Sequence, residues 1–293
     1  MPKERPRRPA PTHRRPGGGP TGAPPSRSPG GPPRNVRLLI EYEGTRYAGW
    51  QVQQEQRTVA GEILSAVRRA LGEAPKLNGA GRTDQGVHAE GQVANFLTRS
   101  TLPAPAIAES LNGVLPADIN ILEAHDVPMS FHARHDAAAR RYRYQIASRR
   151  SAFFKRLIWW VRRPLDHPAM DHAARALVGR HDFTSFADKG ADIVEPRVRV
   201  FQASLRRGDF LTSFTIEADH FLPRMVRRIV GVLVQIGLHN LPAEAMERFL
   251  SEIVDDPAAW TSPPSGLFLE RVVYPAEPGA PPAQRSASPR PGS

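Results

Sequence analysis

Residues 198–219, VRVFQASLRRGDFLTSFTIEAD, have the pattern of two β-strands joined by a turn at Arg207-Gly208-Asp209. Strands joined by so short a turn must pair antiparallel, because a parallel pair needs a long crossover connection. The segments 170–179, 223–237 and 242–254 have helical patterns instead. Hairpins mixed with helices favour an α+β architecture over a doubly wound parallel sheet.

The rest of the chain contains the same mixture of elements. The helix predicted at 58–72 has an apolar face formed by Val59, Ile63 and Val67, and Gly72 suits its end. The helix 223–237 is strongly apolar and has proline in its first turn. The other predicted elements are a helix at 105–115 and strands at 36–42, 92–97, 118–127, 140–147 and 267–274.

Proline and glycine gather at the two ends of the chain. Residues 1–34 contain 11 of the 30 prolines and six glycines. Both residue types oppose ordered packing, so we expect disordered segments at 1–34 and 275–293. The folded part is then divided into an N-terminal half, 35–130, and a C-terminal half, 131–274.

The net charge of +11 lies mainly in these ends, with +7 in residues 1–34 and +1 in 275–293. Charge alone therefore does not establish a nucleic-acid partner. The chain has no cysteine, which excludes disulfides, thiolate zinc sites and cysteine nucleophiles. The first 35 residues lack the apolar region of a signal peptide, and the longest apolar run, near 225–238, is interrupted by Arg227 and Arg228. We expect a cytoplasmic protein that is not inserted in a membrane.

The segment 79–96, GAGRTDQGVHAEGQVANF, combines four glycines with an arginine, an aspartate and a histidine. It begins like a dinucleotide-binding glycine motif, but Asp84 occupies the last glycine position and no buried strand precedes it. From the residues alone, Asp84 is a turn or cap residue and Arg82 a solvated charge or its ion-pair partner. Asp84 with Glu90 does not define a glycosidase pair, because six residues of loop fix no separation. The histidines, including His88, have no metal-ligand spacing, so no metal is expected.

Two distant features are candidate partners for this loop. In the strand 140–147, Tyr142 and Tyr144 alternate with Arg141 and Arg143, which suits base stacking and phosphate contacts or, equally, cross-strand packing with a basic face. In the helix 223–237, Arg224, Arg228 and Gln235 form a polar stripe, and Arg227 lies at its margin. A partly buried guanidinium needs an anion, which is either a structural carboxylate or the loop carrying Asp84.

Taken together, these motifs resemble the bacterial tRNA pseudouridine synthase A family. The resemblance rests on YEGTRYAGWQVQ (42–53), GAGRTDQGVHAEGQVANF, LNGVLPADINI, FHARHDAAARRYRY, HDFTSF, FLPRMVRRIVGVL and SPPSGLFLERVVY, in that order along the chain. It implies two α+β halves with mostly antiparallel sheets that meet at a central RNA-binding cleft. The N-terminal arm falls outside the family pattern, and SPPSGL is a modest variant of the closing segment.

The resemblance also implies a function. Asp84 matches the catalytic aspartate that attacks the target uridine, either at C1′ of the ribose or at C6 of the base. Tyr142 matches the tyrosine that stacks on the target base, Arg227 the residue that pairs with the aspartate, and Arg82 a residue that contacts phosphate or holds the nucleotide out. The glycines give the backbone close access to RNA.

The family isomerises uridines 38, 39 and 40 of the tRNA anticodon stem-loop as a homodimer and uses no cofactor. The alternatives are a non-catalytic tRNA-binding protein and a related synthase that acts on another RNA. A carboxylate facing a polyanion is a liability for simple binding, which favours the enzyme.

Overall fold

The computed structural model describes residues 30–188, 190 and 193–275. The predicted disorder of the two ends concerns segments that lie almost wholly outside these residues. No helix in the described part of the chain is long and apolar enough to cross a membrane.

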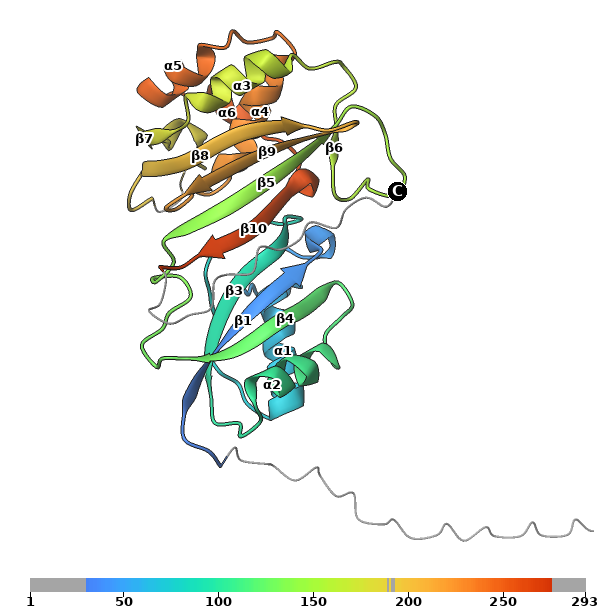
Figure 1. Cartoon of the computed structure of the whole chain (residues 1–293), viewed down its shortest axis with the longest axis vertical. Coiled ribbons are helices and arrows are strands. Elements are labelled where there is room, and N and C mark those ends of the chain that lie inside the picture. The colour runs from blue at the N-terminus through green and yellow to red at the C-terminus, as the bar shows by residue number, and fades with distance from the viewer. Residues whose placement is uncertain (1–29, 189, 191–192, 276–293) are drawn as a thin grey trace, which may run out of the picture.

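The strands form one mostly antiparallel, ten-stranded sheet (Figure 1). Its main path runs β4-β1-β3-β10-β5-β9-β8-β7, with β2 beside β3 and β6 beside β5. The strands are β1 (Arg34–Tyr42), β2 (Asn78–Gly79), β3 (His88–Thr98), β4 (Ile119–Val127), β5 (Ala139–Ala147), β6 (Trp159–Trp160), β7 (Gly179–Asp182), β8 (Arg197–Arg207), β9 (Leu211–Ala218) and β10 (Leu267–Val273).

The helices gather at opposite ends of this sheet (Figure 1). Two helices lie in the described N-terminal half, and four lie in the described C-terminal half. They are α1 (Val59–Leu71), α2 (Ala104–Asn112), α3 (His167–Arg175), α4 (Met225–Gly237), α5 (Ala245–Ser251) and α6 (Asp256–Ala259), with the short 3₁₀ helices η1 (Gly44–Arg46), η2 (Thr184–Phe186) and η3 (Pro264–Gly266). The α+β prediction is confirmed.

Local sequence explains where these elements begin and end. The Thr58 hydroxyl accepts a hydrogen bond from the Gly61 amide, and Gly72 ends α1 with a left-handed φ of 72°. The predicted helix at 223–237 begins at Met225 instead, because Arg224 takes a left-handed φ of 62°. The hairpin prediction at 198–219 is confirmed by β8 and β9, which pair antiparallel.

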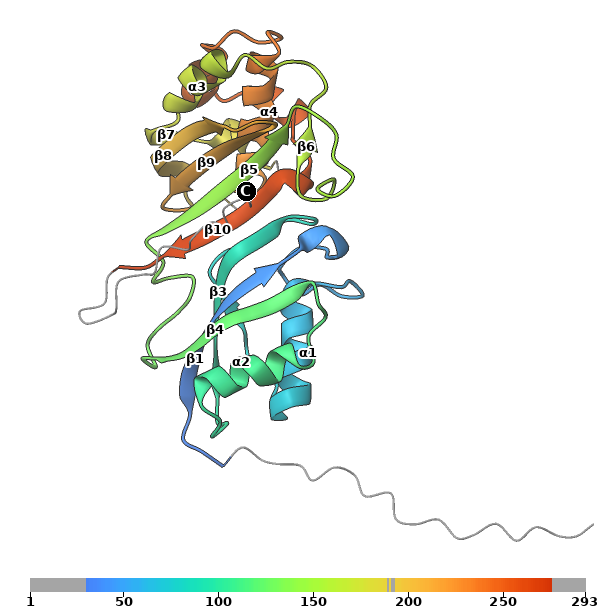
Figure 2. The same ribbon diagram turned by 45° about the vertical axis from the view of Figure 1, so that its right-hand side comes forward.

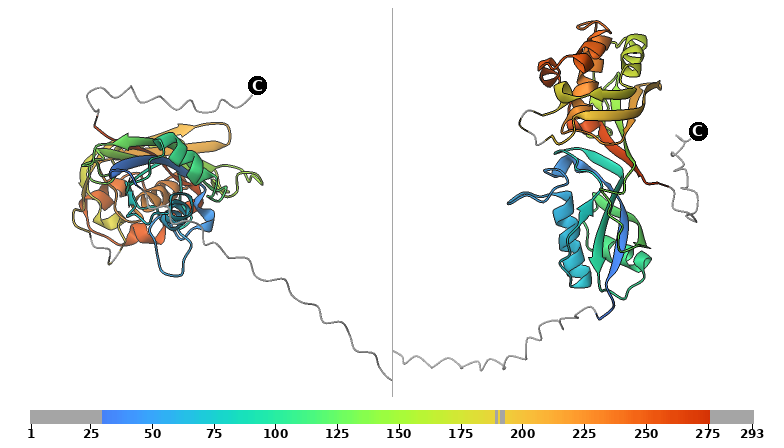
Figure 3. Two further views of the ribbon diagram at one scale, coloured as in Figure 1. Left: turned by 90° about the horizontal axis from the view of Figure 1, so that it is seen from below. Right: turned by 90° about the vertical axis from the view of Figure 1, so that its left-hand side faces the viewer.

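The two halves join through the last strand. In Figure 3 they lie one above the other, and β10 passes between them. This strand pairs antiparallel with β5, and parallel with β3 through Phe268 opposite His88 and Leu269 opposite Ala89. One buried apolar cluster contains side chains from both halves. The sheets of the two halves therefore meet edge to edge, and the boundary proposed near residue 130 lies between β4 and β5 within a continuous sheet.

Candidate active site

The segment between β2 and β3 makes a tight turn at Asp84. The Asp84 carbonyl accepts a hydrogen bond from the Val87 amide at 3.2 Å, and the Gly86 amide donates to the Tyr47 carbonyl at 3.3 Å. Gly86 has a φ of +76°, and a Cβ there would lie 2.9 Å from the Pro264 ring. A side chain at this position would be strained by both its φ and its neighbour, so glycine is required here.

Buried polar contacts hold the turn from behind. The Thr83 hydroxyl is hydrogen bonded to the Tyr42 hydroxyl at 2.8 Å, and its carbonyl accepts from the Trp50 amide at 3.1 Å. Gln92 donates to the Gly81 carbonyl at 2.8 Å. The backbone on both sides of Asp84 is thus held by neighbouring elements.

The C-terminal half also contacts this segment. The Arg140 guanidinium, on β5, donates to the Ala80 carbonyl at 3.0 Å and to the Asp219 carbonyl at 2.9 Å. Burial is the main factor that lowers the pKa of Arg140. This side chain therefore connects the loop of one half to the sheet of the other.

Most glycines of the segment are explained by packing within the protein. A Cβ at Gly79 would lie 2.4 Å from the Trp50 ring, and a Cβ at Gly91 would lie 2.6 Å from the Glu270 carbonyl. At Gly81 the nearest atom would be the Tyr142 hydroxyl oxygen, at 3.8 Å. Packing within the protein is thus enough to explain Gly79 and Gly91, whereas a Cβ at Gly81 would make only an ordinary contact.

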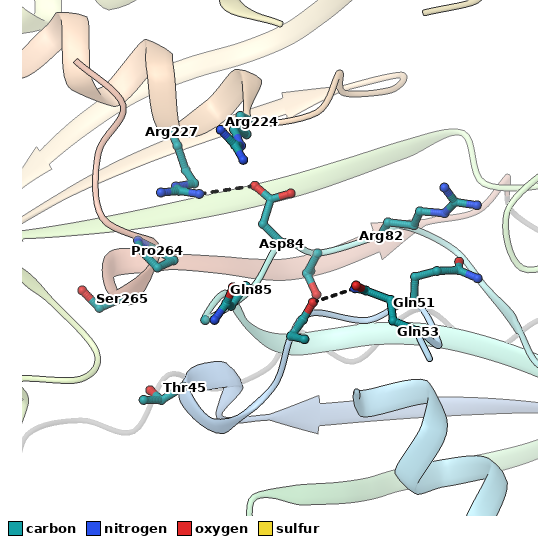
Figure 4. Close-up of a pocket in the computed structure, with 13 residues that line it drawn as sticks. Thr45, Gln51, Gln53, Arg82, Asp84, Gln85, Arg224, Arg227, Pro264 and Ser265 are labelled. Carbon is teal, nitrogen blue, oxygen red and sulfur yellow. Dashed lines mark hydrogen bonds and ion pairs between the residues drawn. The ribbon is translucent and has the colours of Figure 1, made fainter. Parts of the chain in front are cut away.

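Asp84 and Arg227 face each other across the two halves (Figure 4). Arg227 Nη1 lies 3.6 Å from Asp84 Oδ2, and the side chains are 16% and 36% exposed respectively. The Arg227 Nε donates to the Ser262 carbonyl at 2.8 Å, which orients the rest of the guanidinium toward the carboxylate. Of the two partners that the sequence left open for Arg227, the structure selects Asp84.

This pair borders a cavity of about 570 Å³. A volume of this size lies within the range of about 300–1,000 Å³ that is usual for small-molecule sites. Most of its lining residues have polar or charged side chains, and they come from η1 and the segment after it, the Asp84 turn, the start of α4 and η3. The charged and polar side chains that line it include Thr45, Gln51, Gln53, Arg82, Gln85, Arg224 and Ser265.

Arg82 also lines the cavity, but its side chain extends away from Asp84 (Figure 4). It is exposed, and no carboxylate within the described residues forms an ion pair with it. The alternative in which Arg82 is the ion-pair partner of Asp84 is therefore wrong. The side chain is free to meet an anion that enters the cavity.

Tyr142 does not line the cavity. Only 7% of its surface is exposed, its ring contacts Phe221 edge-on with centroids 4.9 Å apart, and its hydroxyl points toward Gly81. Burial raises the pKa of the Tyr142 phenol, and the charges of Tyr42 and Asp84 raise it further. The Tyr142 phenol is thus protonated, and the side chain lies beneath the Asp84 turn.

The other arginines singled out in the sequence have structural partners. Arg141 donates to Glu217 at 2.7 Å, and Arg143 pairs with Glu90. Arg228 is buried, donates to the Ala187 carbonyl and binds Asp188 at 2.9 Å. Arg141 and Arg143 of β5 therefore pack against glutamates and do not form the exposed basic face that the packing interpretation included. Arg228 does not belong to an exposed polar stripe.

His88 has a structural position in the fold. Its ring is buried, its Nδ1 accepts a hydrogen bond from the Gly44 amide at 2.9 Å, and it stacks on Phe268. Burial lowers the pKa of His88. Within the described ranges no group of three or more His, Asp or Glu side chains has a geometry that could hold a metal ion.

The sequence did not identify Thr83, Gln92 and Arg140, whose side chains hold the Asp84 loop in place, and it assigned no function to Arg224. Arg224 takes a left-handed backbone at the start of α4, with a half-exposed side chain 3.3 Å from Asp188 and on the cavity wall. A non-glycine residue in this conformation carries strain, which is a frequent mark of functional sites. No sequence signal of that strain exists, because it depends on how α4 packs.

A family model and named relatives that match this chain carry the same functional description. The family model described as tRNA pseudouridine synthase matches residues 38–136 and 173–275. A protein from Moorella thermoacetica named tRNA pseudouridine synthase A is 44% identical over 82% of this chain and 99% of its own length. A protein of the same name from Acetivibrio thermocellus is 41% identical over 82% of this chain and 100% of its own length. The chain therefore belongs to the tRNA pseudouridine synthase family of isomerases.

Proposed function

We propose that this protein isomerises uridine to pseudouridine in the anticodon stem-loop of tRNA, at positions 38, 39 and 40, with Asp84 as the nucleophile. The observation that carries the proposal is the Asp84 carboxylate, which extends from a held turn, borders the cavity and lies 3.6 Å from the Arg227 guanidinium. Family membership supports the reaction type and the RNA substrate.

The reaction is an isomerisation and needs no external reactant. The N1–C1′ bond of uridine breaks, a C5–C1′ bond forms, the C5 proton leaves, and N1 gains a proton. A carboxylate assists by adding covalently to C1′ or to C6 and leaving again before product release. The nucleotide must first leave the base stack, because the carboxylate cannot reach it inside a helix.

Each residue at the site has a role in this scheme. Arg227 supplies the counter-charge that orients Asp84 and is released toward the substrate as the carboxylate reacts. Arg82, exposed and without a carboxylate partner among the described residues, binds a phosphate beside the displaced nucleotide. Tyr142 lies beneath the turn, so its stacking on the target base requires RNA binding to uncover its ring.

We further propose a homodimer that acts in the cytoplasm, where tRNA is the substrate. Each protomer supplies a complete Asp84–Arg227 pair, because both residues come from one chain. The second copy then extends the surface that holds the tRNA, and sedimentation of the full chain tests this assembly.

Tritium release from unmodified tRNA labelled at C5 of uridine tests the proposal, because replacement of the C5 proton accompanies every turnover. Mapping the product along the RNA tests the positions. We expect release with pseudouridine at 38, 39 and 40. Binding of tRNA without release would favour the non-catalytic alternative, and pseudouridine outside the anticodon arm would identify a synthase with another target.

A further inference from the structure

The segment between β5 and β6 is strongly basic. We define the basic loop as residues 148–158, which lie beside η1 and η3 where the two halves meet (Figure 2). Between residues 149 and 163 the sequence RRSAFFKRLIWWVRR holds six Lys or Arg and no Asp or Glu. Like charges at this density repel one another, so a bound polyanion would stabilise the segment by relieving that repulsion.

The cations of the basic loop are exposed, and no carboxylate in the described ranges pairs with them. This applies to Arg149, Arg150, Lys155 and Arg156. Elsewhere several arginines of the sheet and of α4 have ion-pair partners, as in Arg141 with Glu217 and Arg228 with Asp188. The four cations of the basic loop have no such partner among the described residues and are available to an external anion.

Aromatic rings lie among these cations. Phe153 is 93% exposed, Phe154 is 47% exposed, and Trp160 is 39% exposed. The Arg150 guanidinium lies over the Trp160 ring at 5.4 Å, and Arg149 lies over Phe210 at 4.1 Å. Exposed rings beside unpaired cations are the combination that binds single-stranded nucleic acid, because the rings stack on bases and the cations contact phosphates.

The basic loop is also joined to the wall of the Asp84 cavity. Ser265, which lines the cavity, donates from its hydroxyl to the Ile158 carbonyl at 3.3 Å. On the other side, the Ser148 amide donates to the Phe210 carbonyl at 2.9 Å, which fixes the loop to the β8–β9 hairpin. An RNA chain that leaves the cavity past η3 therefore reaches these cations directly.

We propose that the basic loop is a second RNA-binding surface, which holds the phosphate backbone of the same RNA outside the target nucleotide and stacks an unpaired base on Phe153. The inference rests on the proposed function for the identity of that RNA. A second copy of this chain is a less suitable occupant, because it would bring the same unpaired cations and no carboxylate from its own basic loop.

Affinity and salt dependence test the proposal in the full-length chain. Lys155→Gln/Arg156→Gln and Phe153→Ala are compared with the wild type for binding of unmodified tRNA between low and physiological salt. The matched control is Arg197→Gln/Arg199→Gln, which removes two exposed cations from β8. Single-turnover tritium release at saturating protein is measured in parallel, because it separates weaker binding from slower chemistry.

The double variant is expected to lower the slope of log affinity against log salt by about 0.7 to 0.9 for each phosphate that its side chains no longer neutralise. Phe153→Ala is expected to weaken binding roughly tenfold, the effect of losing one stacked base. The saturating rate should stay at the wild-type value in both. If the wild type binds tRNA without releasing tritium and the slopes still differ, the proposed function fails and this inference stands.

Three results would overturn the inference. The first is wild-type affinity and slope in both variants. The second is a slope change equal to that of the control on β8, which would indicate non-specific attraction. The third is a change in the sedimentation coefficient of Phe153→Ala with unchanged tRNA affinity, which would assign the surface to contact between copies of this chain.

Discussion

Two consecutive arginines on α4 have opposite surroundings. Arg227 reaches across to the other half and lies 3.6 Å from Asp84, in a pair that borders the cavity. Arg228 stays within its own half, where it is buried and binds Asp188 at 2.9 Å and the Ala187 carbonyl. Both pairs join an arginine of α4 to an aspartate of a loop, and they differ in how closely the partners bind.

This difference distinguishes a pair that serves the reaction from a pair that stabilises the fold. An open, loosely bound carboxylate can exchange its arginine for a substrate. The Asp188 carboxylate is almost as exposed as that of Asp84, at 32% against 36%, but it cannot leave Arg228 without leaving a buried guanidinium uncompensated. We therefore infer that Asp84 and Arg227 serve the reaction, and that Asp188 and Arg228 hold α4 in place. Substitutions in the Asp84–Arg227 pair should therefore lower the reaction rate, and substitutions in the Asp188–Arg228 pair should lower the free energy of unfolding.

After the replacement of Asp84 itself, the largest effect is expected for Arg227→Gln, which removes the positive charge beside Asp84. Losing one preorganised electrostatic partner lowers the single-turnover rate by about 10²–10³-fold. Arg227→Lys should recover part of this loss, because a lysine keeps the charge but cannot contact both Ser262 and Asp84. Tritium release at saturating protein is the measurement, and a wild-type rate in Arg227→Gln would remove Arg227 from the mechanism.

Asp188→Ala tests the other pair. It leaves the buried Arg228 charge uncompensated, and we expect the free energy of unfolding to fall by about 2 to 3 kcal/mol. The rate per folded molecule should stay close to wild type. Denaturant unfolding measures the change, with Asp171→Ala as the control, because Asp171 binds Arg175 on the exposed face of α3. Equal losses in the two variants would mean that the Asp188 pair is not structural.

A smaller effect is expected behind the Asp84 turn. Thr83→Val removes the buried hydroxyl that is bonded to Tyr42, at a cost of about 1 to 2 kcal/mol in unfolding free energy. Tyr42→Phe alone should cost a similar amount. If the two hydroxyls depend on each other, the double variant costs less than the sum of the single variants. Strict additivity in this cycle would contradict the hydrogen bond.

The smallest effect is expected in the pH dependence of the unfolding free energy, through His88 where the two halves meet. Burial lowers the pKa of His88 below its ordinary value of 6.5. Its contribution to stability is therefore complete above pH 6.5 and is lost as the pH falls, because the unfolded chain takes up a proton that the folded chain does not. Unfolding free energy measured downward from pH 7 should decline less in His88→Gln. His125→Gln, at an exposed position, controls for the loss of one histidine, and an unchanged slope in His88→Gln would show that His88 does not titrate differently in the folded chain.

Local patterns in the sequence predict most of the fold. The ends of α1 follow from Thr58 and Gly72, and the alternation in β5 correctly places Tyr142 and Tyr144 on the same face of the strand. The position of β10 does not follow from such patterns. It pairs with β3 across some 180 residues of chain (Phe268 opposite His88), and neither segment carries a signal for the other.

The site is predictable only in part for the same reason. The Asp84 loop is conspicuous because its glycines and charges are adjacent in sequence. The partners of Arg227 and Arg228 depend on which loops approach α4, since about 100° of helical rotation turns neighbouring residues toward different elements. The buried position of Tyr142 beneath Gly81 likewise depends on contact between the two halves.

The contrast between the two pairs depends above all on Asp84 being the nucleophile and Asp188 being structural. Asp84→Asn and Asp188→Asn each remove one negative charge from a pair with an arginine of α4. Single-turnover tritium release, corrected for the folded fraction and measured where tRNA binding is saturated, compares them directly. We predict a loss of at least about 10⁴-fold for Asp84→Asn and a rate within a fewfold of wild type for Asp188→Asn. A rate for Asp84→Asn within tenfold of wild type would show that Asp84 is not the nucleophile.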